Sequence, residues 1–231
     1  MPKLYLIGAS LAAACVCVSG AHADELQNQI VAAAKGASPS AYSFRRAMTI
    51  QQTGKPRKIL VEQYDPRRPA ADQWSLVSVD GRAPTAKESA DAHKMKRGPV
   101  PSYGELAKWI GAPASRTNPG PGYVLYHFAR LPAGTLKIGS HDASADTQAE
   151  VLVNIKDKTP LVEHVRLKST KGFRMMLVAA IDSIMIDQRY RVLADGHAVP
   201  SQAISDMSGS MLGKAGRMQA DATYSDFKAV R

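Results

Sequence analysis

The chain has 231 residues, and its 30 Lys and Arg against 20 Asp and Glu give a formal net charge of +10 at pH 7. Such a field attracts anionic partners such as phospholipid head groups, lipopolysaccharide or nucleic acid, or it serves only solubility. The two cysteines, Cys15 and Cys17, both lie near the N-terminus. The rest of the chain therefore has no disulfide, cysteine nucleophile or cysteine-based metal site.

Residues 1–23 have the features of a secretory signal peptide. Lys3 supplies the positive charge, an apolar or small-residue run extends from Leu4 to Val18, and Ala21-His22-Ala23 is a cleavage site of small residues. The run is shorter than the roughly 20 residues that a membrane-spanning helix needs. We therefore expect export to the periplasm and cleavage after Ala23.

A lipoprotein anchored to the outer membrane through Cys15 or Cys17 is the less favoured alternative. The residues before Cys15 are Ala12-Ala13-Ala14, so a large aliphatic residue is missing three positions upstream of this cysteine. With cleavage after Ala23, residues 24–231 form one soluble domain, which is long enough to bury a substantial core. This remainder has 29 basic and 20 acidic residues, a net charge of +9. Nucleic acid is the least expected partner of an exported protein.

The first part of this domain is predicted to be one helix followed by three strands. Residues 24–35 begin with acids, end with Lys35 and carry a narrow apolar stripe, as an amphipathic helix does. Strands are predicted over residues 42–52, 57–65 and 74–81. In the first strand Arg46 is in phase with the apolar residues Phe44, Met48 and Ile50.

Two Asp-Gly pairs follow apolar-alternating runs, at Asp80-Gly81 and Asp195-Gly196, and each is followed by a proline within a few residues. They mark either an acid on a mobile loop or a turn. Glycine ends a strand at little cost, so we interpret both pairs as turns.

A helical insertion over residues 85–122 is predicted to separate two groups of strands. Thr85 and Glu88 have capping-box spacing, so a helix should begin at Thr85. A second short helix over 103–112 has Tyr103, Leu106 and Ile110 on one side, and residues 113–122 are expected to be a loop.

The second half reads as strands joined by short turns. Residues 123–132 form a strand whose apolar side chains lie alternately on its two faces, and residues 150–170 form a hairpin that turns at 156–160. Residues 173–196 form two strands or one bent pair. Residues 201–230 form two last strands around a glycine-rich bend. Alternation of strands and helices is missing, which disfavours a parallel sheet. The fold class is therefore mainly β, with an antiparallel sheet.

Tests for catalytic and metal-binding motifs fail. Gly209 to Gly216 resembles a phosphate loop, but the spacing is one residue short and Ala215 replaces the required hydroxyl residue, so we interpret this segment as a bend or bulge. There is no Gly-x-Ser-x-Gly elbow. We expect no enzymatic activity, no cofactor and no bound metal, because no two histidines have metal-ligand spacing among His93, His127, His141, His164 and His197.

The chain resembles the LolA/LolB-like superfamily of the bacterial outer-membrane lipoprotein carrier. The resemblance rests on the order of elements over most of the chain and, in residues, on Tyr190, Asp195, Gly196 and Pro200, followed by Gly213 and Tyr224 to Phe227. It implies a half-open β-barrel whose concave side, covered by the N-terminal helix and the helical insertion, holds acyl chains. An arginine inside that cavity latches the covering helices in the carrier, and Arg46 is a possible counterpart.

We predict that the concave apolar face includes Phe44, Arg46, Met48, Trp74, Leu76, Tyr126, Phe128, Met175 and Leu177. This prediction rests on strand phase, because side chains two residues apart in a strand lie on the same face. Inside an apolar cavity Arg46 should bond to helix-end carbonyls or to the polar head of a ligand. Replacing it with leucine should change ligand retention and leave the fold intact.

Two functions remain open. In the first, the protein binds a lipid, a lipoprotein acyl chain or another apolar ligand, with an anionic membrane surface as a further partner. In the second, it is an envelope protein-interaction or sensor module on the same fold that transports no ligand. An open cavity lined by Met, Leu and Val favours the first function, and a cavity filled by large side chains favours the second.

Overall fold

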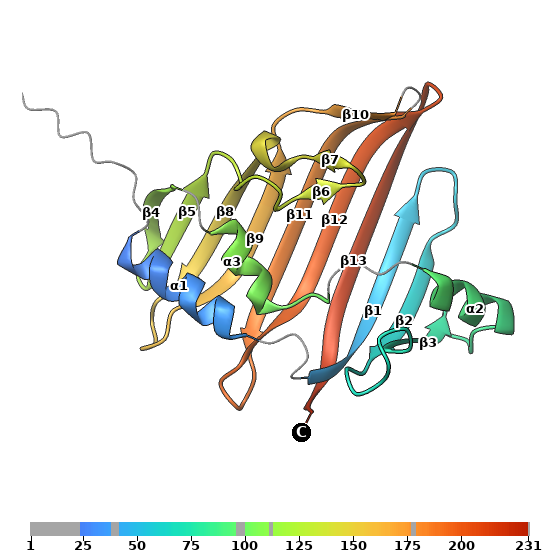
Figure 1. Ribbon diagram of the computed structural model, residues 1–231, viewed down its shortest axis with the longest axis horizontal. Helices are drawn as coiled ribbons and strands as arrows, with labels where there is room; N and C mark the ends of the chain where they lie inside the picture. The colour runs from blue at the N-terminus through green and yellow to red at the C-terminus, as the bar shows by residue number, and fades with distance from the viewer. Residues whose placement is uncertain (1–23, 38–41, 96–99, 111–112, 177–178, 231) are drawn as a thin grey trace, which may run out of the picture.

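Figure 1 shows a computed structural model, which describes residues 24–37, 42–95, 100–110, 113–176 and 179–230. The helices are α1 (Glu25–Gly36), α2 (Ala86–Lys94) and α3 (Leu106–Trp109), and a 3₁₀ turn, η2 (Tyr103–Glu105), leads into α3. Among the described residues, no helix is long and apolar enough to span a membrane.

The strands of the first half are β1 (Tyr42–Gln52), β2 (Lys58–Tyr64), β3 (Trp74–Val79), β4 (Ser115–Gly120), β5 (Tyr123–Phe128), β6 (Lys137–Ile138) and β7 (His141–Asp142). Those of the second half are β8 (Thr147–Asn154), β9 (Leu161–Ser169), β10 (Phe173–Met176), β11 (Ala179–Val192), β12 (Ala198–Met211) and β13 (Lys214–Ala229).

One large sheet has the strand order β3-β2-β1-β13-β12-β11-β9-β8-β5-β4, and β10 pairs with β11. Its pairings are antiparallel. Within the described part of the chain β3 and β4 are the two edges and do not pair with each other, so the sheet stays open. This confirms the predicted fold class, a mainly β protein built on an antiparallel sheet that is not closed into a barrel.

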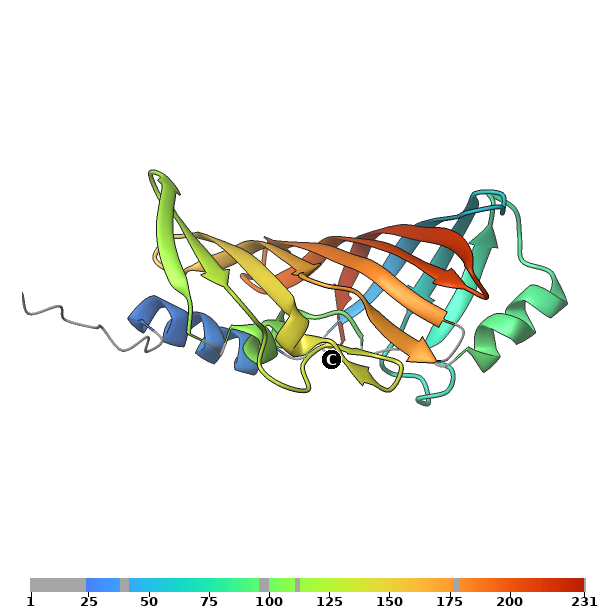
Figure 2. The same ribbon diagram turned by 90° about the horizontal axis from the view of Figure 1, so that it is seen from above.

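The sheet is twisted and curved, and α1, α3 and the small β6–β7 hairpin lie on one side of it (Figures 1 and 2). We call this side the inner face. The strand pairings trace one row of side chains along it: Met48, Ala222, Ala203, Gln188, Val165, Val151 and Tyr126. Helix α2 lies beside β3 at the edge of the sheet, has no buried residue and covers none of this face, which corrects the prediction that the whole insertion covers it.

The main core lies where α1 and α3 pack on β5, β8 and β9. Alternating residues of β5 are buried, namely Val124, Tyr126 and Phe128, because the helices cover one face of that strand. Ile30 and Ala34 of α1 are buried on the sheet, whereas Ala33 is exposed.

The helical insertion is anchored by polar contacts to its neighbours. Tyr103, Leu106 and Ile110 are all buried, as predicted. The hydroxyl of Tyr103 accepts the Val162 N–H of β9 at 2.9 Å, and the buried Gln27 side chain of α1 donates to the Ile110 carbonyl. These two bonds fix the short helix between α1 and the sheet.

Two predictions of local structure are wrong. Residues 113–122 were expected to be a loop, but 115–120 form the edge strand β4, whose backbone pairs with β5 through a shifted register. Pro119 gives a loop signal, yet an edge strand tolerates proline because one of its sides needs no hydrogen bonds. The β6–β7 hairpin was not predicted, because strands of two residues have no periodicity to detect.

Three other local predictions are confirmed. The capping box of Thr85 and Glu88 starts α2. Both Asp-Gly pairs are turns: Gly81 and Gly196 have φ values of 81° and 85°, which only glycine adopts easily. The glycine-rich segment 209–216 contains the turn of the β12–β13 hairpin, at Leu212-Gly213.

Candidate functional site

The structure places the predicted site residues of three strands on the inner face. Arg46 pairs with Glu62 of β2, and Glu62 pairs with Leu76 of β3, so these side chains point to the same side. The row of paired residues from Met48 to Tyr126 lies on the same side and crosses the sheet from β1 to β5. The predicted residues that share this face are Phe44, Arg46, Met48, Trp74, Leu76, Tyr126 and Phe128. Whether they bind a ligand stays a prediction.

The two other predicted residues come from β10 and the sequence after it, and Met175 lies on the side of the sheet that the β6–β7 hairpin covers or beside it. Met175 is half-buried in β10, which branches from β11, and its methyl group reaches Gly139 of the turn between β6 and β7. Leu177 lies outside the described residues.

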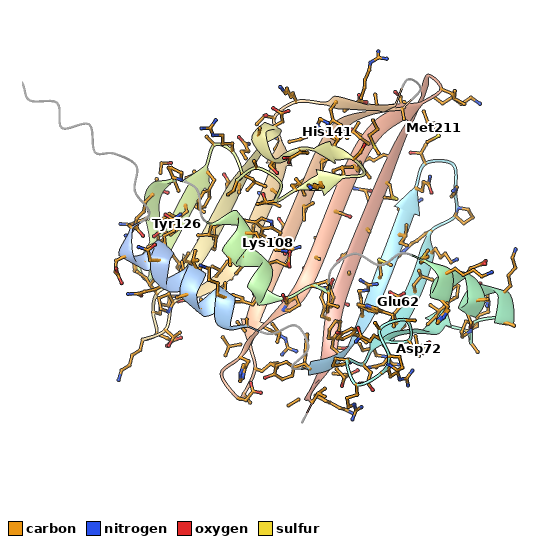
Figure 3. All side chains as sticks on the ribbon, in the orientation of Figure 1. Glu62, Asp72, Lys108, Tyr126, His141 and Met211 are labelled. Atoms are coloured by element: carbon orange, nitrogen blue, oxygen red, sulfur yellow. The ribbon has the colours of Figure 1, made fainter. Side chains whose placement is uncertain are left out.

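The residues that share the inner face are divided between two clusters rather than gathered in one cavity. Tyr126 and Phe128 belong to the core beneath α1 and α3, whereas Phe44, Met48 and Trp74 belong to a second cluster. In Figure 3 the labels of Tyr126 and Glu62 mark these two regions, near opposite edges of the sheet. The face beneath the helices is therefore filled by side chains.

Arg46 is bound by a carboxylate, which corrects the expectation that helix-end carbonyls or a ligand would satisfy it. Its Nε lies 3.0 Å from Glu62 Oε2, and its Nη2 binds the same oxygen. Its guanidinium stacks over the Trp74 ring at 4.2 Å from the centroid, a cation–π arrangement. Glu62 is only 2% exposed, and an anion so buried requires a cationic partner.

An aromatic cluster connects this ion pair to the end of the sheet. Phe44 stands at its centre, with ring centroids 5.0 Å from Tyr64, 5.7 Å from Trp74, 5.8 Å from Tyr224 and 5.3 Å from Phe227. Burial raises the pKa of Tyr224, and the nearby Arg46 opposes that rise. The rings form a continuous apolar wall from β3 to the last residues of β13.

This wall opens into a pocket of about 410 Å³ at the end of the sheet where β1 begins and β13 ends. The end of α1, the segment before η2, the β8–β9 turn and the β11–β12 turn complete it. The side chains that carry its apolar character are Ala33, Tyr42, Phe44, Leu161, Val199 and Phe227. Of the predicted site residues that the structure describes, only Phe44 lines this pocket.

A polar group stands at the rim of the pocket. The Tyr42 hydroxyl donates to Asp195 Oδ2 at 2.6 Å, and His197 Nδ1 lies 3.2 Å from Asp195 Oδ1. Burial, together with the bond to Asp195, raises the pKa of Tyr42 to about 12. The Tyr42 hydroxyl and the His197 N–H lower the pKa of Asp195, so this carboxylate stays charged near neutral pH.

A second polar group fixes the start of α1. Asp24 caps the helix by accepting the Gln27 N–H at 2.8 Å. It also accepts the Tyr126 hydroxyl at 2.6 Å and binds Arg116 of β4 at 3.1 Å. Burial works to raise the pKa of Asp24, but these three donors outweigh it and the pKa is lowered. Asp24 thus ties the helix to two strands of the inner face.

Sequence reasoning missed most of the pocket. The second Asp-Gly pair and Phe227 were recognised only as parts of the fold, because the turn that brings them to β1 is distant in sequence. Glu62 had a detectable signal: it lies in phase with Leu60 and Tyr64 in an alternating strand, which places an acid on the apolar side. Among the described residues, no cluster of three His, Cys, Asp or Glu could hold a metal ion.

No protein-family model and no curated protein matches the chain. Among solved structures, the chain is similar to the crystal structure of a LolA superfamily protein from Nitrosomonas europaea, with 11% sequence identity and a TM-score of 0.35. The likeness covers 89% of this chain and 94% of that chain. At this level of likeness, the function has to be inferred from the chain's own residues.

Proposed function

We propose that the protein is a non-catalytic binding protein of the cell envelope that holds an apolar ligand, such as a lipid or the acyl chain of a lipoprotein, in the pocket beside Tyr42 and Phe44. One observation carries the proposal: a pocket of about 410 Å³ lies at the open end of the inner face, between the end of α1 and the aromatic wall. Ligand pockets typically have volumes of about 300–1,000 Å³ and are lined mainly by apolar side chains with a few polar groups.

The chemistry of the lining indicates how such a ligand would be oriented. An acyl chain would lie against Phe44, Val199 and Phe227, where apolar surface leaves water. The hydroxyl of Tyr42 and the imidazole of His197 would face the polar end of the ligand at the rim. The half-buried Arg46 is held by Glu62 and supports the aromatic wall from behind, so we assign it no direct contact with the ligand.

Export is part of the proposal. The segment from Lys3 to Ala23 has the features of a signal peptide, and a periplasmic protein without a disulfide needs the large core that α1 and α3 complete. We retain cleavage after Ala23 and a location in the periplasm, with attachment through Cys15 or Cys17 as the less favoured route.

A specific observation favours the alternative function, a protein-interaction or sensor module. The inner face beneath α1 and α3 is filled by large side chains, including the fully buried Leu106, Tyr126 and Phe128. A carrier that used this part of the face would first have to move both helices. The end pocket does not require this movement, and we therefore prefer the ligand-binding proposal.

Native mass spectrometry of the protein isolated from its own cell envelope tests the proposal. We expect a co-purified ligand with an acyl chain, released on unfolding. A protein that carries no ligand, and that also fails to bind a fluorescent fatty-acid probe after delipidation, would contradict ligand binding and favour the interaction module.

A further inference from the structure

The long hairpin of β12 and β13 reaches the end of the sheet opposite the pocket, where β11 runs beside it as far as the pair Ala179 and Met211. Its pairing continues to Met211 and Lys214, whereas β1 stops pairing with β13 at Gln52 and Met218. The hairpin thus extends four residues beyond β1, about 13 Å at the rise of a strand. In Figure 3 the label of Met211 lies at this far end.

The tip of this hairpin carries exposed apolar side chains. Met211 is 62% exposed and Leu212 is 73% exposed. Leu212 also has a φ of 50°, followed by Gly213 at 76°. Two-residue hairpin turns of this kind favour Asn-Gly, because a bulky residue with positive φ is strained. A leucine that is both strained and exposed to water indicates a partner that buries it.

Basic residues surround this tip. The described residues that meet at this end, 51–59, 171–176, 179–180 and 207–219, contain no Asp or Glu. Arg217 pairs with Asp206 and Lys171 pairs with Asp146. Five further cations form no ion pair with another described residue, namely Lys55, Arg57, Lys58, Arg174 and Lys214.

These cations lie at the level of the tip. The Thr53 N–H binds the Arg217 carbonyl at 3.0 Å, which holds the β1–β2 turn beside β13. Arg174 pairs with Ala180, which in turn pairs with Ser210, one residue before Met211. Two acids lie near these cations: the exposed Asp182, two residues beyond Ala180 in β11, and Asp80, whose carboxylate accepts the Ile59 N–H at 2.7 Å. The surface around Met211 and Leu212 is therefore predominantly positive.

We propose that this end of the sheet docks on an anionic phospholipid bilayer, with Met211 and Leu212 inserted at the boundary of the acyl region and the surrounding cations on the lipid head groups. A predominantly positive surface that encloses a small apolar tip matches an anionic membrane. A stable protein interface buries roughly 1,200 Å² or more, far beyond what two exposed side chains supply. The proposal is independent of ligand binding in the pocket.

Partition of the purified protein onto vesicles of equal parts phosphatidylglycerol and phosphatidylcholine tests this docking. Leu212→Asn should keep the turn, since asparagine tolerates positive φ, and should weaken partition about tenfold by removing apolar surface from the bilayer. Ile155→Asn is the matched control: Ile155 is an exposed apolar residue following β8, near the pocket end, and its replacement should leave partition unchanged.

The contribution of the cations to vesicle binding is tested by a second pair of variants. Lys214→Glu should weaken partition roughly fivefold or more, because each cation near an anionic surface contributes to binding. Lys158→Glu changes the net charge equally at the opposite end and should have a much smaller effect. Tryptophan fluorescence of Leu212→Trp should shift to shorter wavelength with these vesicles and not with pure phosphatidylcholine.

Three results would overturn the membrane assignment. The first is equal partition of the parent and Leu212→Asn, and the second is an unshifted emission of Leu212→Trp on the anionic vesicles. The third is equal partition of Lys214→Glu and Lys158→Glu. A purified envelope protein that bound the parent and lost binding on Leu212→Asn, with vesicle partition unchanged, would assign the tip to a protein interface instead.

Discussion

Arg46 and Glu62 face each other across β1 and β2, and the carboxylate of Glu62 binds both Nε and Nη2 of the arginine. The side chain of Arg46 is 15% exposed and that of Glu62 is 3% exposed. The charge that was expected to serve a ligand is therefore used inside the protein. It supports the aromatic wall through the Trp74 ring.

Arg46→Leu should destabilise the fold by about 3–5 kcal/mol, because it removes the guanidinium that the buried Glu62 carboxylate binds. The expectation that this variant leaves the fold intact is thereby revised. Urea unfolding measures the change, and Arg46→Leu combined with Glu62→Leu should recover most of the stability. A single variant as stable as the parent would show that the ion pair is not required.

Tyr103→Phe tests the anchor of the helical insertion. The Val162 N–H would lose its acceptor inside the core, and a buried donor without an acceptor costs about 1–3 kcal/mol. Equilibrium unfolding should show this loss, with hydrogen exchange at Val162 accelerated. Tyr123→Phe removes a hydroxyl that accepts a hydrogen bond from the exposed Lys156, and it should leave both measurements near the parent values. Unchanged exchange at Val162 in Tyr103→Phe would contradict the anchor.

The Asp24 cap should make stability depend on pH. Its pKa is lowered in the folded state, so its contribution is present above the unfolded value of about 3.9 and is lost as pH falls through the folded value. Asp24→Asn keeps a capping oxygen and removes the charge. It should therefore be less stable than the parent near neutral pH, and the difference should shrink in acid. Urea unfolding at several pH values measures this, and a difference that stays constant would contradict the account.

Tyr42→Phe should raise the pKa of Asp195 toward its ordinary value, because the tyrosine hydroxyl is the largest cause of the lowering. The hydroxyl is a permanent donor near neutral pH, since the pKa of Tyr42 itself is raised to about 12. Carboxyl titration by nuclear magnetic resonance measures the shift. His197→Ala, which removes only a weaker contributor, should move the pKa less. An unchanged titration in Tyr42→Phe would place Tyr42 outside this polar group.

Much of the fold could be predicted because its signals are local. Strand alternation placed β1, β5 and the β8–β9 hairpin, and the capping residues placed the start of α2. Alternation also gave the common side of Phe44, Arg46 and Met48 in β1, since parity within a strand is independent of long-range contacts. The edge strand β4 could not be recognised, because its proline and glycine give the signals of a loop.

The candidate site could be predicted only in part, because it forms where distant segments meet. Strand phase identifies a side of the sheet, but it does not show which part of that side the helices fill. Tyr126 and Phe128 were therefore grouped with Phe44, although α1 and α3 cover the first two and the end pocket adjoins the third. The pocket joins Tyr42 to Asp195, residues 153 positions apart, and no local pattern shows that contact.

The central claim, that an apolar ligand occupies the end pocket, is tested most directly by filling the pocket from α1. Ala33 is exposed on this helix and lines the pocket, whereas its neighbour Ala32 is exposed and does not line it. Phenylalanine at either position has the same cost to the helix. Titration with a fluorescent fatty-acid probe should show that Ala33→Phe binds at least roughly tenfold more weakly than the parent, as expected when an aromatic side chain occupies ligand volume. Ala32→Phe should bind like the parent, and equal binding by all three proteins would contradict a ligand site in this pocket.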